Sequence, residues 1–365
     1  MTGQVHTSEH VNSMLVVIRI QALWQLGRPS GLEKVIRPNF YYDNLPADLI
    51  PQYLSPSSEN GPVSGRLVIV GDVHGMRKSL EALLDKVSFD KSKGDHLILV
   101  GDLVNKGPDS SGVVDLAIKL GASAVRGNHE NAVLNAAAEI NATRDTLLHS
   151  EDLTGNPAVP ENPAADLSGD NARDLETPDK SASTITTGAT TSHSTASVLS
   201  TRQLDWLAAL PLILRLKLPY VPKSSLGDTL IVVHAGLVPG ISLENQDPHA
   251  VMHVRSVVRA SGNEAGFVPA EISGEESWVM EWDRWQDSLA SKTTVIFGHD
   301  ARRRLQLGRY AIGLDSACLY GHQLSAVVIA ASDTGIEHQV IQVQCADASI
   351  VPTVSVNQGD KTIAL

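Results

Sequence analysis

The chain has 365 residues, 42% of them hydrophobic and only 4% aromatic, which is enough apolar material for one large domain or two small ones. Its formal net charge of -12 argues against binding a nucleic-acid duplex or an anionic membrane. No apolar run is long enough for a transmembrane segment. Two cysteines, Cys318 and Cys345, are too few for a disulfide framework or a cysteine-rich zinc site. They favour a reducing compartment, so a cytoplasmic location is expected.

The first 64 residues are mixed in composition and are expected to form an N-terminal extension, in which Met14–Leu26 has the pattern of a short amphipathic helix. From Arg66 onward, strand and helix patterns alternate. Short apolar runs predict buried strands at Arg66–Val70, His96–Val100 and Ala122–Arg126. Helical spacing of apolar residues predicts helices at Ser79–Val87, Val113–Leu120 and Asn131–Ile140.

The composition changes between about residues 150 and 197, where Ser, Thr, Asp, Pro, Asn and Ala dominate. Such a segment buries too little apolar surface to offset its ordering entropy, so a flexible insertion is predicted. A helix is expected next at Thr201–Leu210, followed by strands at Leu230–Val233, Thr293–Phe297, Tyr310–Leu314, Ala326–Ala330 and His338–Gln344. Residues 346–365 resemble a loose C-terminal tail, so the folded domain is expected to span 65–345.

Five apolar runs each end in a polar cluster that contains Asp, Asn or His. The clusters are Gly71-Asp72-Val73-His74-Gly75, Gly101-Asp102, Gly127-Asn128-His129-Glu130, His234-Ala235-Gly236 and Gly298-His299. Ligands of open α/β sheets bind just beyond the carboxyl ends of the strands, so the five clusters predict one shared site. Mixed nitrogen and oxygen ligands suit Zn, Fe or Mn better than Ca or Mg.

The order of these motifs resembles that of the phosphoprotein-phosphatase branch of the calcineurin-like metallophosphoesterases, from Arg66 to Gln344 without the insertion. The resemblance implies an α/β fold, a four-layer α/β/β/α sandwich, with two divalent ions (Zn, Mn, Fe, Co or Mg) that activate the attacking water. It implies that Asp72 and His74 hold one ion and that Asp102 bridges both. The second ion would be held by Asn128, His234 and His299.

The same resemblance assigns roles to residues around the ions. His129 would be the catalytic proton donor to the leaving oxygen. Lys106 stands at the position of a phosphate-binding arginine, and Arg255 resembles a second phosphate clamp. Asn128 would face the phosphate as well as the second ion.

Departures from the motifs distinguish the chain from protein Ser/Thr phosphatases. Asn105 replaces the acidic partner of the catalytic histidine, and Lys106 replaces an arginine. The segment Gly313-Leu314-Asp315-Ser316-Ala317-Cys318-Leu319-Tyr320-Gly321 replaces a cysteine-containing loop. These features resemble the ApaH-like phosphatases, a group that includes bacterial symmetric diadenosine tetraphosphate hydrolases and fungal endopolyphosphatases. The fungal resemblance keeps a vacuolar location as the alternative.

A phosphorylated, anionic substrate is therefore expected, with inorganic polyphosphate first, dinucleoside polyphosphates second and a capped RNA end third. The low aromatic content favours polyphosphate, because a nucleobase would use a stacking partner. Trp278, Trp282 and Trp285 share a helical face, and packing in the core is their expected role. A phosphoprotein phosphatase and a metal-binding scaffold without activity are the remaining alternatives.

Four arginines lie shortly after His299, in an otherwise acidic chain: Arg302, Arg303, Arg304 and Arg309. They form either a solvated turn or a track that receives the phosphates beside the scissile one, since arginine presents a planar donor fork to phosphate oxygens.

Overall fold

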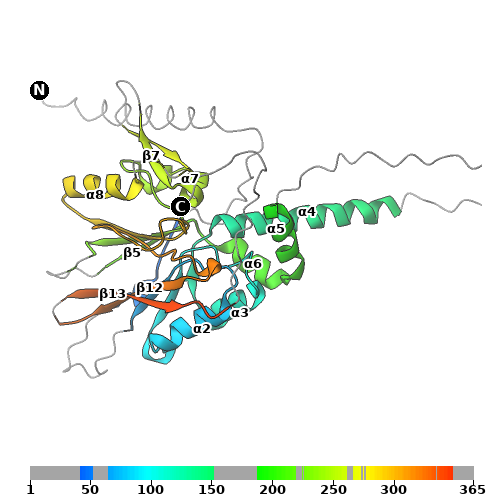
Figure 1. Ribbon diagram of the computed structural model, residues 1–365, viewed down its shortest axis with the longest axis horizontal. Coiled ribbons are helices and arrows are strands. Elements are labelled where there is room, and N and C mark those ends of the chain that lie inside the picture. Colours follow the sequence, from blue (N-terminus) through cyan, green and yellow to red (C-terminus); the bar gives the residue numbers. More distant parts are fainter. Residues whose placement is uncertain are drawn as a thin grey trace, which may run out of the picture.

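The structure is a computed structural model that describes residues 42–51, 65–151, 187–218, 224, 226–260, 266–272, 274, 277–333 and 335–347 (Figure 1). The helix expected at Met14–Leu26 and the tail beyond 347 lie outside these residues. Within the described residues, no helix has both the length and the apolar character needed to cross a bilayer.

The first sheet has five strands in the order β13-β12-β2-β3-β4. Its bounds are β2 Leu67–Val70, β3 His96–Leu99, β4 Ser123–Ala124, β12 Gln323–Ala331 and β13 Ile336–Gln344. Strands β2, β3 and β4 run parallel, whereas β12 pairs antiparallel with both β2 and β13. All four side chains of β2 are buried, because the two faces of this sheet are both covered.

The second sheet has six strands in the order β1-β5-β6-β9-β11-β10. Its bounds are β1 Tyr42–Asn44, β5 Ile213–Lys217, β6 Thr229–Val233, β9 Thr293–Phe297, β10 Gln306–Leu307 and β11 Ala311–Gly313. Strands β6, β9 and β11 run parallel. Strand β1 pairs parallel with β5, so residues 42–44, expected in the N-terminal extension, complete the edge of this sheet.

Three hydrophobic clusters separate four layers of structure (Figure 1). Side chains alternate along β2, with Val68 and Val70 packing against helices and Leu67 and Ile69 packing between the sheets. The helices on the first sheet are α2 Arg77–Lys86, α3 Ser110–Leu120 and α6 Thr201–Ala209, and those on the second are α7 Pro248–His253 and α8 Trp278–Ser288. This arrangement confirms the predicted α/β/β/α sandwich.

Shorter elements complete the described fold. The strands β7 Ser256–Arg259 and β8 Phe267–Ala270 form a separate antiparallel pair. Short 3₁₀ helices lie at η1 Ala47–Leu49, η2 Lys91–Lys93, η3 Leu243–Asn245 and η4 Cys318–Tyr320. Trp278 and Trp282 of α8 are only 2% and 3% exposed, so they belong to the core, as expected.

Two helices lie at the ends of the predicted insertion. Helix α4 spans Asn128–Glu151, and α5, Thr187–Val198, packs against it (Figure 1). The prediction of flexibility from 150 to 197 is therefore wrong for residues 187–197, and residues 152–186 lie outside the described part. Composition misled here because α5 docks through small residues, among which Ser192 and Ala196 are buried.

Cys318, in η4, and Cys345, directly after β13, form a disulfide. The expectation of a reducing compartment assumed that the two cysteines are separate thiols. Because they are paired, that expectation no longer has support. The bond fixes η4 to the end of the longest antiparallel strand pair.

Candidate metal centre and substrate pocket

The five predicted clusters meet at one edge of the sandwich. Each of the strands β2, β3, β4, β6 and β9 leads into one of them. The loops approach so closely that a Cβ atom at Gly127 would overlap a carboxylate oxygen of Asp102, and one at Gly298 would overlap Asp72. Glycine is required at these two positions because another loop, rather than solvent, occupies the space.

The backbone at the site is held in an uncommon conformation. The φ angles of His74, Asp102, Asn105, Lys106 and His299 are 46°, 51°, 75°, 67° and 69°. Positive φ costs free energy for residues with a Cβ atom and persists where the surrounding structure imposes it, often at functional sites.

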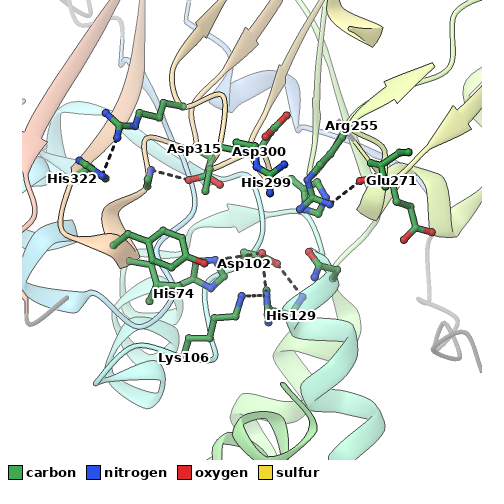
Figure 2. A pocket seen from close by; sticks show the side chains of 18 residues that line it. His74, Asp102, Lys106, His129, Arg255, Glu271, His299, Asp300, Asp315 and His322 are labelled. Atoms are coloured by element: carbon green, nitrogen blue, oxygen red, sulfur yellow. Dashed lines mark hydrogen bonds and ion pairs between the residues drawn. The ribbon is translucent and has the colours of Figure 1, made fainter. Parts of the chain in front are cut away.

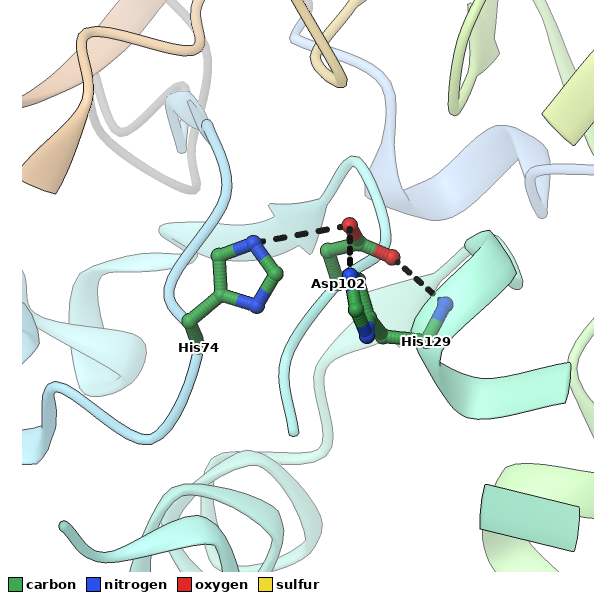
Figure 3. Close-up of side chains that lie close together, drawn as sticks. All are labelled: His74, Asp102 and His129. Carbon is green, nitrogen blue, oxygen red and sulfur yellow. Dashed lines mark hydrogen bonds and ion pairs between the residues drawn. The ribbon is translucent and has the colours of Figure 1, made fainter. Parts of the chain in front are cut away.

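Asp102 lies at the centre of the site. Its Oδ2 atom is 3.5 Å from His74 Nε2, and its Oδ1 atom is 3.4 Å from His234 Nε2. The backbone N–H of His129 donates to Asp102 Oδ1 over 3.0 Å, and the rings of His74 and His129 both approach Asp102 Oδ2 (Figure 3). Asp102 thus belongs to both groups of potential metal ligands, which is the position that a bridging carboxylate requires.

The histidine rings are oriented by backbone carbonyls. Because a carbonyl only accepts hydrogen bonds, His234 Nδ1 must donate to Val100 O, 3.0 Å away, and His299 Nε2 must donate to His253 O, 3.2 Å away. In the neutral rings, His234 Nε2 and His299 Nδ1 then carry lone pairs, and these atoms are 3.2 Å apart. His74 is held in the same way by a 3.4 Å contact from Nδ1 to Val104 O.

While the rings are neutral, several lone pairs therefore converge on one place. The amide oxygen of Asn128 adds another, 3.0 Å from His234 Nε2. Buried lone pairs that face each other are costly unless a cation lies among them. This set of imidazole, carboxylate and amide ligands fits divalent transition metals, and carbonyl-bound imidazoles are typical of metal ligands.

The buried carboxyl groups influence one another's pKa values. Burial, and then the carboxyls of Asp315 and Asp102, raise the pKa of Asp72 well above its usual value. Burial also raises the pKa of Asp102, but the rings of His234, His129 and His74 outweigh it and hold that pKa well below its usual value. Burial raises the pKa of Asp315 to about 6. A cation near these groups would relieve their mutual repulsion.

Most of the imidazoles are held neutral, the form that binds metals. Burial lowers the pKa of His74 to about 4 and lowers those of His129 and His299 well below their usual value. Burial also lowers the pKa of His234, but the negative charge of Asp102 outweighs it and raises that pKa overall. Asp102 thus attracts positive charge to this position, whether a proton or a metal ion.

Glu130 organises the loop that carries Asp102. Its carboxylate is fully buried and accepts four backbone N–H groups, from Gly127, Asp102, Leu103 and Val104, over 2.7–3.1 Å. Burial, followed by the charge of Asp102, raises the pKa of Glu130 to about 7. The Glu130 side chain therefore sets the backbone path from which the central carboxylate projects.

A cavity of about 810 Å³ opens above the ligands (Figure 2). His322 and Arg255 lie on opposite sides of it, with Asp102 between them (Figure 2). The cations in its lining are Lys106, Arg255, Arg302 and Arg304. Arg303 and Arg309 are absent from the lining; Arg303 pairs with Asp300, a lining residue, at 2.6 Å, and Arg309 pairs with Asp287 at 2.7 Å.

The structure brings all the predicted site residues together. Those that line the cavity are His74, Asp102, Lys106, Asn128, His129, Arg255 and His299. Asp72 and His234 are buried and are not part of that lining; Asp72 accepts a hydrogen bond from the backbone N–H of His299, and His234 Nε2 lies 3.0 Å from Asn128 Oδ1. Residues that sequence reasoning missed include Asp315, Tyr320, His322 and Glu271. For Asp315 a signal existed, since it follows β11 as the other clusters follow their strands.

Comparisons with known proteins agree with this geometry. Residues 65–324 match the family model described as calcineurin-like phosphoesterase. A zinc-dependent endopolyphosphatase of Saccharomyces cerevisiae is 28% identical over 294 residues, which cover 76% of this chain and 80% of the relative. A symmetrical bis(5'-nucleosyl)-tetraphosphatase of Nitrosospira multiformis is 25% identical, covering 76% of this chain and 94% of the relative.

A solved structure supports the same assignment. It is described as that of a candidate diadenosine tetraphosphatase, is 30% identical, covers 84% of this chain and 98% of its own, and superposes with a TM-score of 0.54. The family match spans more than half of the 365 residues and contains the whole set of convergent ligands. The chain belongs to the calcineurin-like phosphoesterases and is a metal-dependent phosphatase.

Proposed function

We propose that this phosphatase hydrolyses phosphoanhydride bonds of inorganic polyphosphate, with two divalent ions held around Asp102. The observation that carries the substrate is the lining of the cavity, which contains the cations Lys106, Arg255, Arg302 and Arg304 together with several of the ligands. A chain of phosphates carries charge beyond the scissile group, and each additional phosphate needs its own cation. The similarity to an endopolyphosphatase supports the same substrate.

Each residue has a proposed role in this reaction. Asp72, His74 and Asp102 would hold one ion, and Asp102, Asn128, His234 and His299 the other. When bound, the two ions supply positive charge at the phosphoryl oxygens and lower the pKa of the attacking water. Lys106, Asn128 and Arg255 would orient the phosphoryl group, and His129 would donate a proton to the leaving oxygen.

A dinucleoside polyphosphate is the second candidate, and Tyr320 favours it. This side chain lines the cavity and is 38% exposed, so its ring is accessible to a nucleobase, and base–aromatic stacking contributes about 1–3 kcal/mol. The similarity to tetraphosphatases supports the same alternative.

One product assay separates the candidates. Long-chain polyphosphate, diadenosine tetraphosphate, capped RNA and a phosphopeptide are incubated in parallel with the full chain and each of zinc, manganese, cobalt, iron and magnesium. The proposal expects the highest kcat/KM on polyphosphate. A higher value on diadenosine tetraphosphate, together with a loss of that activity in Tyr320→Ala, would transfer the proposal to the second candidate.

A further inference from the structure

Asn105 stands where an acidic partner of His129 was expected, and its surroundings fix the direction of its amide. The side chain is within hydrogen-bonding distance of four groups. The Oδ1 atom lies 3.0 Å from the backbone N–H of Lys106 and 3.3 Å from Thr195 Oγ1. The Nδ2 atom lies 3.0 Å from both His129 Nδ1 and Ser192 Oγ.

The backbone N–H of Lys106 can only donate a hydrogen bond, so together with the Thr195 hydroxyl it favours the orientation in which the oxygen of the Asn105 amide faces it. The amide nitrogen then faces His129 Nδ1 and Ser192 Oγ, and both of its protons have an acceptor. Asn105 is 1% exposed and Ser192 is 5% exposed. Water cannot easily reach them, so the loss of one of these hydrogen bonds would leave a buried polar group unsatisfied and would cost free energy.

The direction of this amide determines the tautomer of His129. A nitrogen that accepts from Asn105 Nδ2 carries no proton, so the neutral ring of His129 must carry its proton on Nε2. His129 Nε2 is also the ring nitrogen that lies 2.6 Å from Lys106 Nζ, in the lining of the cavity.

A hydrogen bond from Lys106 would require the other tautomer of the His129 ring. A charged ammonium group would donate to His129 Nε2, and one neutral ring cannot accept at both nitrogens. The Asn105 amide is held by three further bonds, whereas Lys106 ends in a flexible side chain whose Nζ can move to a phosphate oxygen. The amide therefore decides the tautomer.

Two of the bonds that hold Asn105 come from α5, which is distant in sequence. Ser192 and Thr195 belong to a Ser- and Thr-rich helix that packs against α4, the helix that begins with Asn128 and His129. We propose that Ser192 and Thr195 are positioning residues for His129: they lock the Asn105 amide so that the ring directs its Nε2 N–H, as a hydrogen-bond donor, toward the leaving oxygen of the substrate. This inference rests on the proposed role of His129.

The first test reads the tautomer directly and does not depend on activity. The full chain is labelled with ¹⁵N-histidine and loaded with diamagnetic zinc, and the His129 signals are identified by their loss in His129→Gln. Two-bond ¹H–¹⁵N spectra distinguish a ring protonated on Nε2 from one protonated on Nδ1. We expect the Nε2 form in the wild type and the Nδ1 form in Asn105→Asp, whose carboxylate can only accept.

The Ser192→Ala variant completes this test. With one acceptor of the amide removed, the expected spectrum shows both tautomers in exchange, while Ser194→Ala, an exposed serine of the same helix, leaves the wild-type spectrum unchanged. The proposal is overturned if the wild type carries the proton on Nδ1, or if Ser192→Ala retains the pure Nε2 form.

The second test is kinetic. For an alkyl phosphate, whose leaving oxygen needs a proton, Ser192→Ala should lower kcat roughly three- to tenfold with KM unchanged. For an activated aryl phosphate, kcat should stay the same. In an Asn105→Ala background the additional effect of Ser192→Ala should vanish, since both changes act through one amide. Additive losses, or equal losses on both substrates with a lowered Tm, would indicate a merely structural role.

The two proposals fail in distinguishable ways. If His129→Gln lowers kcat by the same factor for the alkyl and the aryl phosphate, His129 is not the proton donor, and that part of the proposed function is wrong. The spectra would still show whether α5 sets the tautomer of the ring.

Discussion

Asp102 is the residue on which the proposed metal centre depends. Both of its oxygens face ligand nitrogens, at 3.5 Å and 3.4 Å, so replacing one oxygen with an amide nitrogen removes the link between the two groups. Asp102→Asn should lose most of the bound metal and nearly all activity, as measured by elemental analysis and phosphate release. Asp85→Asn, on the exposed side of α2, is the matched control. Two ions per chain in an inactive Asp102→Asn would argue against bridging.

His129 is predicted to act on the leaving group. Its ring is close to Asp102 but is held by Asn105 rather than by a backbone carbonyl, unlike the three histidines assigned to metals. His129→Gln should lower kcat for an alkyl phosphate by about 10²–10⁴ with metal content unchanged. An activated aryl phosphate should be affected much less, because its leaving oxygen needs no proton. A variant that has lost its metal would instead place His129 among the ligands.

Glu130 offers a test of how the site is held together. In Glu130→Gln, one oxygen becomes an NH₂ group facing two backbone N–H donors, which should cost about 2–3 kcal/mol of unfolding free energy. Chemical denaturation measures the loss, and metal affinity should fall with it because the Asp102 loop is no longer fixed. Glu139→Gln, at an exposed position of the same helix, serves as control. Unchanged stability would show that the loop holds its path without this carboxylate.

At the scale of elements, the four arginines between β9 and β11 divide into two pairs. Arg302 and Arg304 line the cavity, whereas Arg303, paired with Asp300, and Arg309, paired with Asp287, do not. The double change Arg302→Ala with Arg304→Ala should raise KM for polyphosphate several-fold and leave turnover of a single-phosphate aryl ester nearly unchanged. The effect should shrink as salt increases, since salt screens exposed charges.

Arg309→Ala is the matched control for this pair. It removes one positive charge from the neighbouring turn between β10 and β11, outside the cavity. If Arg309→Ala raises KM for polyphosphate as much as the double variant does, the effect comes from net charge and the proposed phosphate track is wrong.

The elements differ in how well they could be predicted. Leu67–Val70 is a continuous apolar run, and Thr293–Phe297 combines two threonines with Val295, Ile296 and Phe297, so the sequence was enough to predict both as buried strands. Strand β1 was missed, because Tyr42–Asn44 is a short, partly exposed edge strand whose partner is far away in sequence. Helix α5 was missed because its small polar residues resemble those of a disordered segment.

The same distinction applies to the site. Ligands that follow strands, such as Asp72 and His234, are local features that a motif reveals. The outer cavity depends on how loops fold over it: sequence could not tell Arg303 from Arg304, because the turn's backbone, with Arg304 at a φ of 59°, decides which side chain points inward. Tyr320 and His322 were missed for the same reason.

At the scale of the molecule, the ligands join the two sheets. Asp72 and Asp102 follow strands of the first sheet, whereas His234 and His299 follow strands of the second. Bound metal should therefore stabilise the whole sandwich, by about 2.7 kcal/mol at a free concentration 100 times Kd. Chelation should lower Tm by about 5–10 °C. Differential scanning calorimetry with and without chelator measures this, and Asp102→Asn should show almost no shift.

The joining of two sheets also has a consequence for synthesis on the ribosome. The carboxylates of Asp72 and Asp102 emerge early, together with Asn128, while His234 and His299 are made only after the chain has passed residue 233. Domains tend to fold as their residues emerge, but here the earlier part holds Asp72 and Asp102 with the imidazoles of His74 and His129 and without those of His234 and His299. In the nascent first half these carboxylates must stay hydrated or bind metal weakly. The complete metal site can form only after β9 and His299 have been synthesised.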